Sequence, residues 1–373
     1  MSAASDRDLP AGGLPSRRTV MKAALVTGLT GALVSAGGCA SAQSQLPAAA
    51  AAATGAPPAP GPGGDVITRE IPRTRERLPV VGLGSFMTFD QRPAQPREHL
   101  RETLNRFWNG GGRLVDTSPL YGLAEVNVGD LAADAGIADR LFITGKTWAT
   151  GEYLGDFSHA RRQLEQSKTR LWRAQLDILQ VHNLVNVEVN VPILRHFKRE
   201  GHIRYLGVTH HDPLYYPALE HWIRTGDLDF IQVHYSIQHR LPEQRILPLA
   251  AERGTAVMVN MPLEKHRLHN LVRDAPLPDF AADIGCQNWA QFFLKYVVSH
   301  PAVTCALPAT SNPDHLTENL GAMRGELPDQ PMRERMVRHM ETIPGFNELQ
   351  SVPWYPGKSF SGVVSHPPVP SVT

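Results

Sequence analysis

Short apolar segments and amphipathic segments alternate along most of the chain, from Val66 onward. The apolar segments have the length and β-branched content of buried strands, and the amphipathic ones repeat their apolar residues every three or four positions, as on one helix face. The predicted strands are residues 80–84, 113–116, 140–146, 176–182, 203–209, 228–233, 256–260 and 303–307. The predicted helices are residues 97–109, 123–134, 158–171, 191–199, 214–224, 243–253, 288–299 and 313–322.

This alternation predicts an α/β protein whose parallel strands close into a (β/α)8 TIM barrel. Eight strand–helix units over roughly 240 residues match the usual size of that barrel. A doubly wound open sheet is the alternative, and it would need a glycine-rich phosphate fingerprint at the first strand–helix turn. Residues 82–86 hold two of its three glycines and no helix begins there. The barrel is therefore the preferred prediction.

Both ends of the predicted barrel carry additional segments. Residues 66–71 and 77–81 flank a polar turn, which predicts an N-terminal hairpin. The sequence from Pro344 on has little periodicity and predicts an irregular C-terminal arm. The predicted domain limits are thus 65–343 for the barrel and 344–373 for the arm.

The first 64 residues differ in composition from the rest. Arg17 and Arg18 are adjacent, Lys22 follows, and residues 23–38 form an apolar run rich in Gly and Ala. This resembles a twin-arginine (Tat) export signal over residues 1–42. Residues 43–64 consist almost entirely of Ala, Pro, Gly, Gln and Ser, a composition that predicts a tether.

Two processing sites overlap in the predicted signal, and both stay open. Ala40-Ser41-Ala42 fits a peptidase site before Gln43, whereas residues 36–39 fit a lipobox that would leave a lipidated Cys39 as a lipid anchor. The predicted location is the periplasm in the first case and a membrane-tethered lipoprotein in the second. The Tat export machinery is the predicted partner in either case.

Composition narrows the range of partners. The 373 residues carry 37 basic and 36 acidic side chains, so there is no electrostatic footprint for nucleic acid. The three cysteines are too few for a disulfide framework. No apolar run in the body of the chain approaches the roughly 20 residues of a membrane span. We expect a monomer that acts on a small molecule.

Proton-handling side chains stand at the ends of three consecutive predicted strands. Asp116 ends the second strand, with Tyr121 five residues later, while Lys146 ends the third and His182 the fourth. The carboxyl ends of barrel strands meet at one face, where chemistry takes place in such folds. No metal site is predicted there.

Such a group of residues is suited to carbonyl reduction. Hydride addition to a carbonyl develops negative charge on the oxygen, and a proton must be supplied. A tyrosine with an ordinary pKa of ~10 is a poor acid unless a cation favours its phenolate. Lys146 can supply that charge, Asp116 can hold the ammonium, and His182 can donate to the carbonyl oxygen.

The residues from Asp116 to Gly122 resemble the D-T-A-x-x-Y-G block of the aldo/keto reductase family. Lys146 and His182 match the strand-end lysine and histidine of that family, and the resemblance covers about residues 67–319. It implies NAD(P)(H)-dependent reduction of an aldehyde or ketone to an alcohol, with Tyr121 as the general acid. It also implies a substrate pocket walled by Leu120 and Trp148.

The resemblance implies a nicotinamide cofactor lying across the barrel mouth. The family positions that contact it correspond here to Thr209, His210, Gln232, Thr310, His315, Glu318 and Asn319. Members that prefer the 2′-phosphate usually have lysine where Ala309 stands and arginine where His315 stands. Family frequency favours NADP(H), and the loss of both cations keeps NAD(H) open.

Two other functions remain as alternatives. An exported subunit that holds a cofactor but turns over little would suit a compartment without free reduced nicotinamide. A metal-dependent barrel hydrolase would use His182, His210, His211, His234 and Asp116 as ligands. The first strand, however, ends without a metal ligand, and His266 and His269 are expected to face solvent.

Overall fold

The computed structural model describes residues 65–92, 94–148 and 157–352. The predicted signal peptide (1–42), the tether (43–64) and the last part of the predicted arm (353–373) lie outside the described residues. In the described part, no helix is long and apolar enough to cross a membrane.

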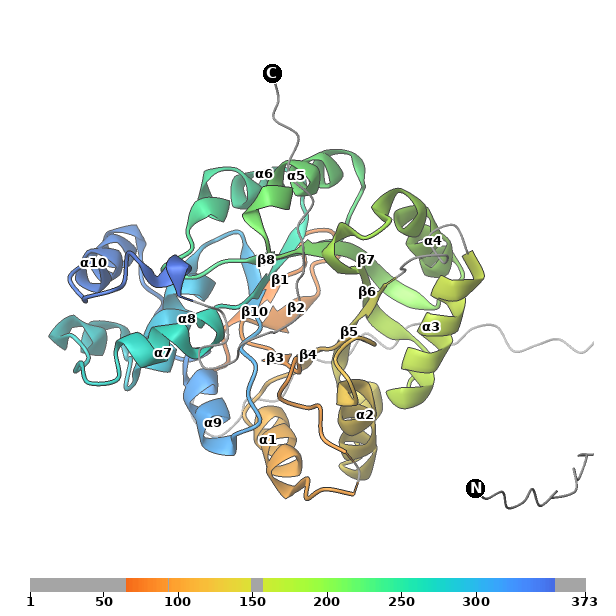
Figure 1. Cartoon of the computed structure of the whole chain (residues 1–373), viewed down its shortest axis with the longest axis horizontal. Helices are drawn as coiled ribbons and strands as arrows, with labels where there is room; N and C mark the ends of the chain where they lie inside the picture. Colours follow the sequence, from red (N-terminus) through yellow and green to blue (C-terminus); the bar gives the residue numbers. More distant parts are fainter. Residues whose placement is uncertain (1–64, 93, 149–156, 353–373) are drawn as a thin grey trace, which may run out of the picture. The chain divides into compact units, whose positions relative to one another are not determined.

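The core of the fold is a closed barrel of parallel strands (Figure 1). The strands follow one another in chain order: β3 (Leu83–Gly84), β4 (Leu114–Asp116), β5 (Phe142–Thr147), β6 (Leu176–Val181), β7 (Ile203–His210), β8 (Phe230–His234), β9 (Ala256–Asn260) and β10 (Val303–Ala306). The backbone N–H of Gly82 donates to the Ala306 carbonyl (2.8 Å), and that of Gly84 donates to the Pro308 carbonyl (3.0 Å). These bonds join the first strand segment to the last, so the predicted (β/α)8 architecture is confirmed.

The described helices surround the barrel, and eight of them agree with the predicted ones to within a few residues. They are α1 (Glu98–Asn109), α2 (Ala124–Asp134), α3 (Phe157–Arg170), α4 (Val187–Arg199), α5 (Tyr216–Thr225), α6 (Ile246–Glu252), α7 (Arg267–Leu271), α8 (Trp289–Ser299), α9 (Pro313–Gly321) and α10 (Gln330–Glu341). Helix α4 begins at Val187 instead of residue 191, and Pro192 lies inside it.

Two of the described helices, α7 and α10, were not predicted, although the sequence of α10 has the signals of a helix. The Asp329 side chain accepts a hydrogen bond from the Met332 N–H, as an N-cap does. Met336, Val337 and Met340 then form its buried face, at the spacing of a helix. The last predicted helix ended at residue 322, and α10 lies beyond it within the predicted barrel domain of residues 65–343.

The N-terminal hairpin closes the amino end of the barrel. Strands β1 (Thr68–Glu70) and β2 (Arg77–Pro79) pair antiparallel, which confirms the predicted hairpin. Ile71 and Leu78 join the apolar cluster inside the barrel, and Tyr205 donates to Glu76 (2.6 Å). Because this end is covered, ligands reach the barrel from the carboxyl ends of the strands.

A glycine allows helices α2 and α3 to approach closely. A Cβ at Gly129 would lie 1.9 Å from the Arg170 carbonyl oxygen, so Gly129→Ala is expected to destabilise the fold by about 2–3 kcal/mol through overpacking. Gly136→Ala is the control, because its left-handed φ of 66° alone carries a penalty of about 1 kcal/mol and no atom lies within 4 Å. Urea denaturation measures the free energy of unfolding of both variants, and equal losses of stability would contradict the packing argument.

Candidate active site

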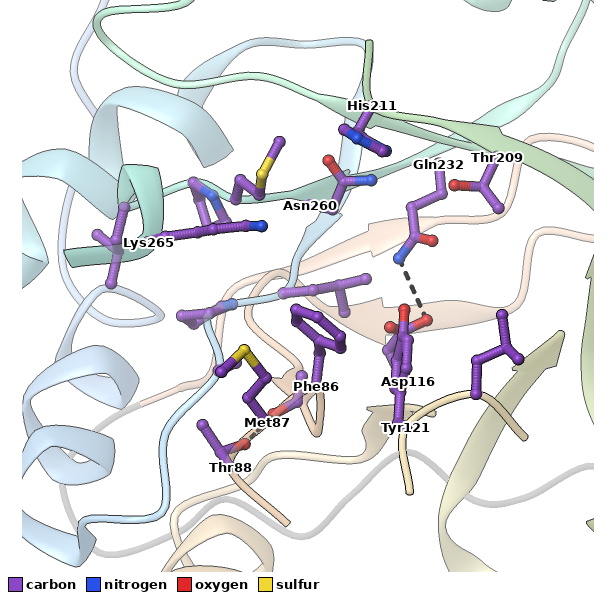
Figure 2. A pocket seen from close by; sticks show the side chains of 18 of the residues that line it. Phe86, Met87, Thr88, Asp116, Tyr121, Thr209, His211, Gln232, Asn260 and Lys265 are labelled. Atoms are coloured by element: carbon purple, nitrogen blue, oxygen red, sulfur yellow. Dashed lines mark hydrogen bonds between the residues drawn. The ribbon is translucent and has the colours of Figure 1, made fainter. Parts of the chain in front are cut away.

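A cavity of about 670 Å³ opens at the carboxyl ends of the strands (Figure 2). Its wall is formed by strand ends and by the loops that follow them, from β3 to β10. Of the predicted catalytic residues, Asp116, Tyr121 and His182 line the cavity. Lys146 lies behind them and is 2% exposed.

Lys146 and Asp116 form a buried ion pair. The Lys146 Nζ donates to Asp116 Oδ1 (2.6 Å) and to the Thr117 carbonyl (3.0 Å). Gln232 also donates to Asp116 Oδ1 (3.1 Å). Burial raises the pKa of Asp116 and lowers the pKa of Lys146, and the charge of each residue opposes the shift of the other. Each therefore depends on its partner to stay charged.

The Tyr121 ring lies directly beside this ion pair. The Lys146 Nζ is 4.9 Å from the centre of the ring. Edge-on contacts place the ring centre 4.9 Å from that of Phe86 and 5.8 Å from that of His182. An ammonium at this position favours the phenolate over the phenol, since opposite charge stabilises an ionised group.

His182 is held neutral. Burial, followed by the nearby charges of Lys146 and His211, lowers the pKa of His182 to about 2. The Ser118 Oγ lies 3.3 Å from Nδ1 of His182. When Nδ1 accepts a hydrogen bond from the Ser118 hydroxyl, the proton of the neutral ring is on Nε2, which is then a hydrogen-bond donor. The sequence prediction missed Ser118, although it stands where the resembling motif has alanine.

The predicted pocket residues lie together on one part of the wall. Leu120 and Trp148 both line the cavity, with Phe86 and Met87. The Trp148 ring contacts His182 edge-on, with 5.3 Å between the ring centres. Phe86, Met87 and Leu120 are between 40% and 49% exposed, so this part of the wall presents apolar surface.

The predicted carboxamide residues are divided between the cavity and its surroundings. Thr209 and Gln232 are buried, are paired in the β7–β8 register and line the cavity. His210 is absent from the cavity lining. Its ring stacks on Tyr215 with 4.0 Å between the ring centres, and its Nδ1 accepts from a backbone N–H (3.0 Å). His211 lines the cavity instead.

The predicted adenosine-end residues lie along helix α9 and the turn before it. The Thr310 hydroxyl accepts from the Asn312 N–H (3.0 Å), which shapes the turn before the helix. His315 and Glu318 are exposed, whereas Asn319 is buried. They do not line the cavity, although the neighbouring Ala309 does. Their contact with a cofactor stays a prediction.

Histidines near the cavity are paired with other groups. Within the described ranges, no three His, Cys, Asp or Glu side chains come together as a metal site. His234 donates to Glu264 (2.5 Å). His266 is exposed and lines the cavity, whereas His269 is half-buried against Phe293. The expectation that both of these loop histidines face solvent thus holds only for His266.

Comparison with known proteins assigns the chain to a family. The model of the aldo/keto reductase family matches residues 80–335, which is more than half of the chain. The chain belongs to the aldo/keto reductase family.

Relatives of this aldo/keto reductase are distant. The NADH-specific methylglyoxal reductase of Escherichia coli is 25% identical over 201 residues, which cover 45% of this chain and 60% of that reductase. An aldo/keto reductase from Klebsiella pneumoniae, solved with NADP and acetate, is 24% identical with a TM-score of 0.61. The match covers 71% of this chain and 92% of that one. An aldo/keto reductase from Bacillus halodurans is 20% identical with a TM-score of 0.60, and the match covers 74% of this chain and 96% of that one. These structures share the barrel fold.

The buried ion pair gives a stability prediction. Lys146→Met is expected to destabilise this aldo/keto reductase by about 3–5 kcal/mol, because Asp116 is left buried without a counter-charge. Asp116→Asn should have a similar effect, and the double variant should lose much less than the sum. Urea denaturation measures the free energy of unfolding of all three variants.

The control is Arg101→Met, which breaks an exposed ion pair with Asp134 and should change stability by less than about 1 kcal/mol. Additive losses at Asp116 and Lys146 would contradict the coupling.

Proposed function

We propose that this aldo/keto reductase reduces an aldehyde or ketone to an alcohol with a nicotinamide cofactor. The observation that carries the proposal is the convergence of Tyr121, His182 and the Lys146–Asp116 pair at one cavity. These groups provide a proton, a neutral hydrogen-bond donor and a fixed positive charge. A carbonyl oxygen that gains charge requires all three.

The cavity has polar groups suited to a nicotinamide carboxamide. Thr209 and Gln232 line it, and so does Asn260. The Asn260 Oδ1 is buried and has no hydrogen-bond partner among the described residues, so an amide N–H donor would satisfy it. The cofactor, when bound, supplies the hydride. The protein side chains bind it, orient the substrate and provide the proton.

The proton comes from Tyr121. As negative charge develops on the carbonyl oxygen, the Tyr121 hydroxyl gives up its proton, and the nearby ammonium of Lys146 stabilises the phenolate that remains. Asp116 keeps this ammonium charged and in place. Neutral His182, with its proton on Nε2, orients the same oxygen without competing as an acid.

The wall of the cavity favours a substrate with an apolar or aromatic body. Phe86, Met87, Leu120 and Trp148 gather next to Tyr121 and His182. Clustered exposed apolar side chains at a cavity are typical of a ligand-binding surface. Such a substrate differs from methylglyoxal, the compound in the name of the Escherichia coli relative.

We infer NADP(H) as the preferred cofactor and keep NAD(H) as the alternative. Structures from Klebsiella pneumoniae hold NADP and NADPH, whereas the Escherichia coli relative is named NADH-specific. In this chain Ala309 carries no charge, and the exposed His315 is the group that could meet a 2′-phosphate.

Export through the Tat route remains part of the proposal. Its support is the Arg17-Arg18 pair, the apolar run that follows and the tether of residues 43–64. Because Tat substrates fold before transport, the protein would load its cofactor inside the cell and carry it out.

Replacing the proposed acid tests the mechanism. Tyr121→Phe is expected to lower kcat/KM for a panel of aromatic aldehydes by about 10²- to 10⁴-fold, since it removes the proton donor and little else. NADPH and NADH oxidation measured by absorbance provides the readout. Tyr215→Phe, a tyrosine that does not line the cavity, is the matched control and should retain full activity. Full activity of Tyr121→Phe would show that another group is the acid.

Replacing the twin arginines tests export. In cells that carry the full chain, Arg17→Lys/Arg18→Lys should leave the protein in the cytoplasm, because the Tat receptor reads the arginine pair. Fractionation and immunoblotting measure its location. The variant Cys39→Ser, with both arginines intact, should be found free of membranes if Cys39 is lipidated in the wild type, and should be located like the wild type if cleavage follows Ala42. Equal export of the twin-lysine variant would contradict the Tat assignment.

A further inference from the structure

The loop after β9 forms part of the cavity wall in a constrained conformation. Residues 261–266 contribute several lining residues, Lys265 and His266 among them. Four residues of this loop have left-handed φ values, which are 51° for Met261, 52° for Glu264, 50° for Lys265 and 73° for His266. Residues other than glycine rarely adopt this conformation, and it persists only where surrounding contacts fix it.

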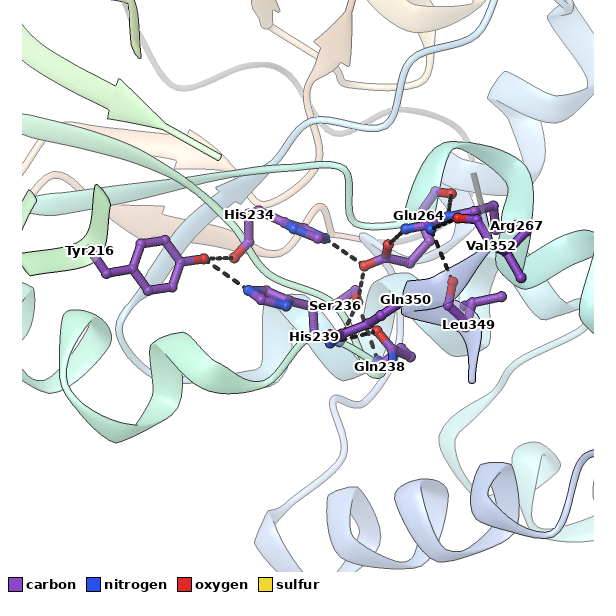
Figure 3. A network of polar contacts seen from close by, with 10 residues as sticks. All are labelled: Tyr216, His234, Ser236, Gln238, His239, Glu264, Arg267, Leu349, Gln350 and Val352. Carbon is purple, nitrogen blue, oxygen red and sulfur yellow. Dashed lines mark hydrogen bonds and ion pairs between the residues drawn. The ribbon is translucent and has the colours of Figure 1, made fainter. Parts of the chain in front are cut away.

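A buried polar network behind the cavity provides those contacts (Figure 3). Glu264 is 1% exposed and accepts hydrogen bonds from His234 Nε2 (2.5 Å), from Ser236 Oγ (2.6 Å) and from Arg267. Burial alone would raise the pKa of Glu264, but the hydrogen bonds and charges of these three partners lower it to about 2. Glu264 is therefore ionised, and its carboxylate binds the loop to the three partner side chains.

Arg267 extends the network to the C-terminal segment. It is 3% exposed, and its Nη1 donates to the backbone carbonyls of Leu349 (3.0 Å) and Val352 (2.7 Å), as Figure 3 shows. Its Nε donates to the Glu264 carbonyl (3.2 Å). One buried guanidinium thus ties the loop to residues more than 80 positions later in the chain.

Between these two buried residues, the side chain of Lys265 lines the cavity. Its Nζ lies 5.5 Å from the centre of the Phe86 ring, which in turn contacts Tyr121. Burial, with the charge of Arg267, lowers the pKa of Lys265 to about 8, so it remains mostly protonated at neutral pH. Figure 2 shows Lys265 in the part of the cavity that also holds Asn260.

We propose that Glu264 and Arg267 are positioning residues that, tied to Leu349 and Val352, fix the 261–266 loop so that Lys265 meets the phosphates of the bound cofactor. This rests on the proposed function, since it requires a nicotinamide dinucleotide in the cavity. An ammonium group forms strong charge-assisted contacts with phosphate oxygens, and prior ordering of the loop avoids the entropy loss of ordering it upon binding. The C-terminal segment then supports cofactor retention through Arg267.

A double-mutant cycle on the full chain tests the proposal. The dissociation constants and dissociation rates of NADPH and NADH are measured by quenching of tryptophan fluorescence for wild type, Lys265→Ala, Arg267→Met and the double variant. Lys265→Ala and Arg267→Met should each raise the dissociation constant about tenfold. The double variant should exceed Lys265→Ala by less than about twofold, because Arg267 acts through Lys265.

Arg333→Met is the matched control. Arg333 is 5% exposed and is bonded to Tyr235 and Glu243, none of which lines the cavity. This variant should lose thermal stability as Arg267→Met does, with an unchanged dissociation constant.

The proposal is overturned if Arg267→Met binds cofactor like Arg333→Met, or if its effect is undiminished in the Lys265→Ala background. Should Arg267→Met fail to fold, Lys265→Ala decides alone, since an unchanged dissociation constant contradicts the proposed contact. A wild-type chain that binds neither cofactor would contradict the proposed function instead.

Discussion

The active site depends on a charge that the fold keeps buried. The Lys146 ammonium has almost no contact with water, and it stays charged because Asp116 lies 2.6 Å away. Removing two charges from water is expensive, and only a close, fully hydrogen-bonded pair offsets the loss. The Thr117 carbonyl and Gln232 provide the additional bonds, so strands β4, β5 and β8 are all held in register by the same interaction. The chemistry of Tyr121 follows from this arrangement.

Around this pair the cavity is lined by both apolar and polar side chains. The loops after β3, β4 and β5 contribute apolar and aromatic side chains, of which Phe86, Leu120 and Trp148 are examples. The strand ends and loops from β7 to β9 contribute polar or cationic ones, such as Thr209 and Lys265, together with apolar ones such as Leu263. The cavity thus offers apolar side chains to a carbonyl compound and polar or cationic ones to an anionic dinucleotide, with Tyr121 and His182 next to the apolar ones.

The barrel and its catalytic corner could be predicted because both are periodic or local. The strand–helix alternation reports burial, and the carboxyl ends of the strands place Asp116, Lys146 and His182 together whatever the loops do. The alternation of side chains along β7 was harder to read, because the strand continues to His210, so that His211 enters the cavity. Successive side chains of a strand point to opposite sides, so Thr209 and His211 face the cavity and His210 points away from it.

Long-range contacts could not be predicted in this way. Glu264 and Arg267 stand in a polar sequence that looks like an exposed loop, and their burial depends on His234 and on carbonyls near residue 350. Ser118 was equally hidden, since only the approach of β4 and β6 brings it to His182. In each case the side chain's role is set by a partner distant in sequence.

Isotope transfer tests the central claim, carbonyl reduction by hydride from a bound nicotinamide, most directly. The purified protein would be incubated with an aromatic aldehyde and NADPH, or NADH, deuterated at both C4 positions, and the alcohol analysed by mass spectrometry. The account predicts one deuterium on the former carbonyl carbon of the alcohol. Alcohol formed without deuterium, or no alcohol with either cofactor, would contradict it.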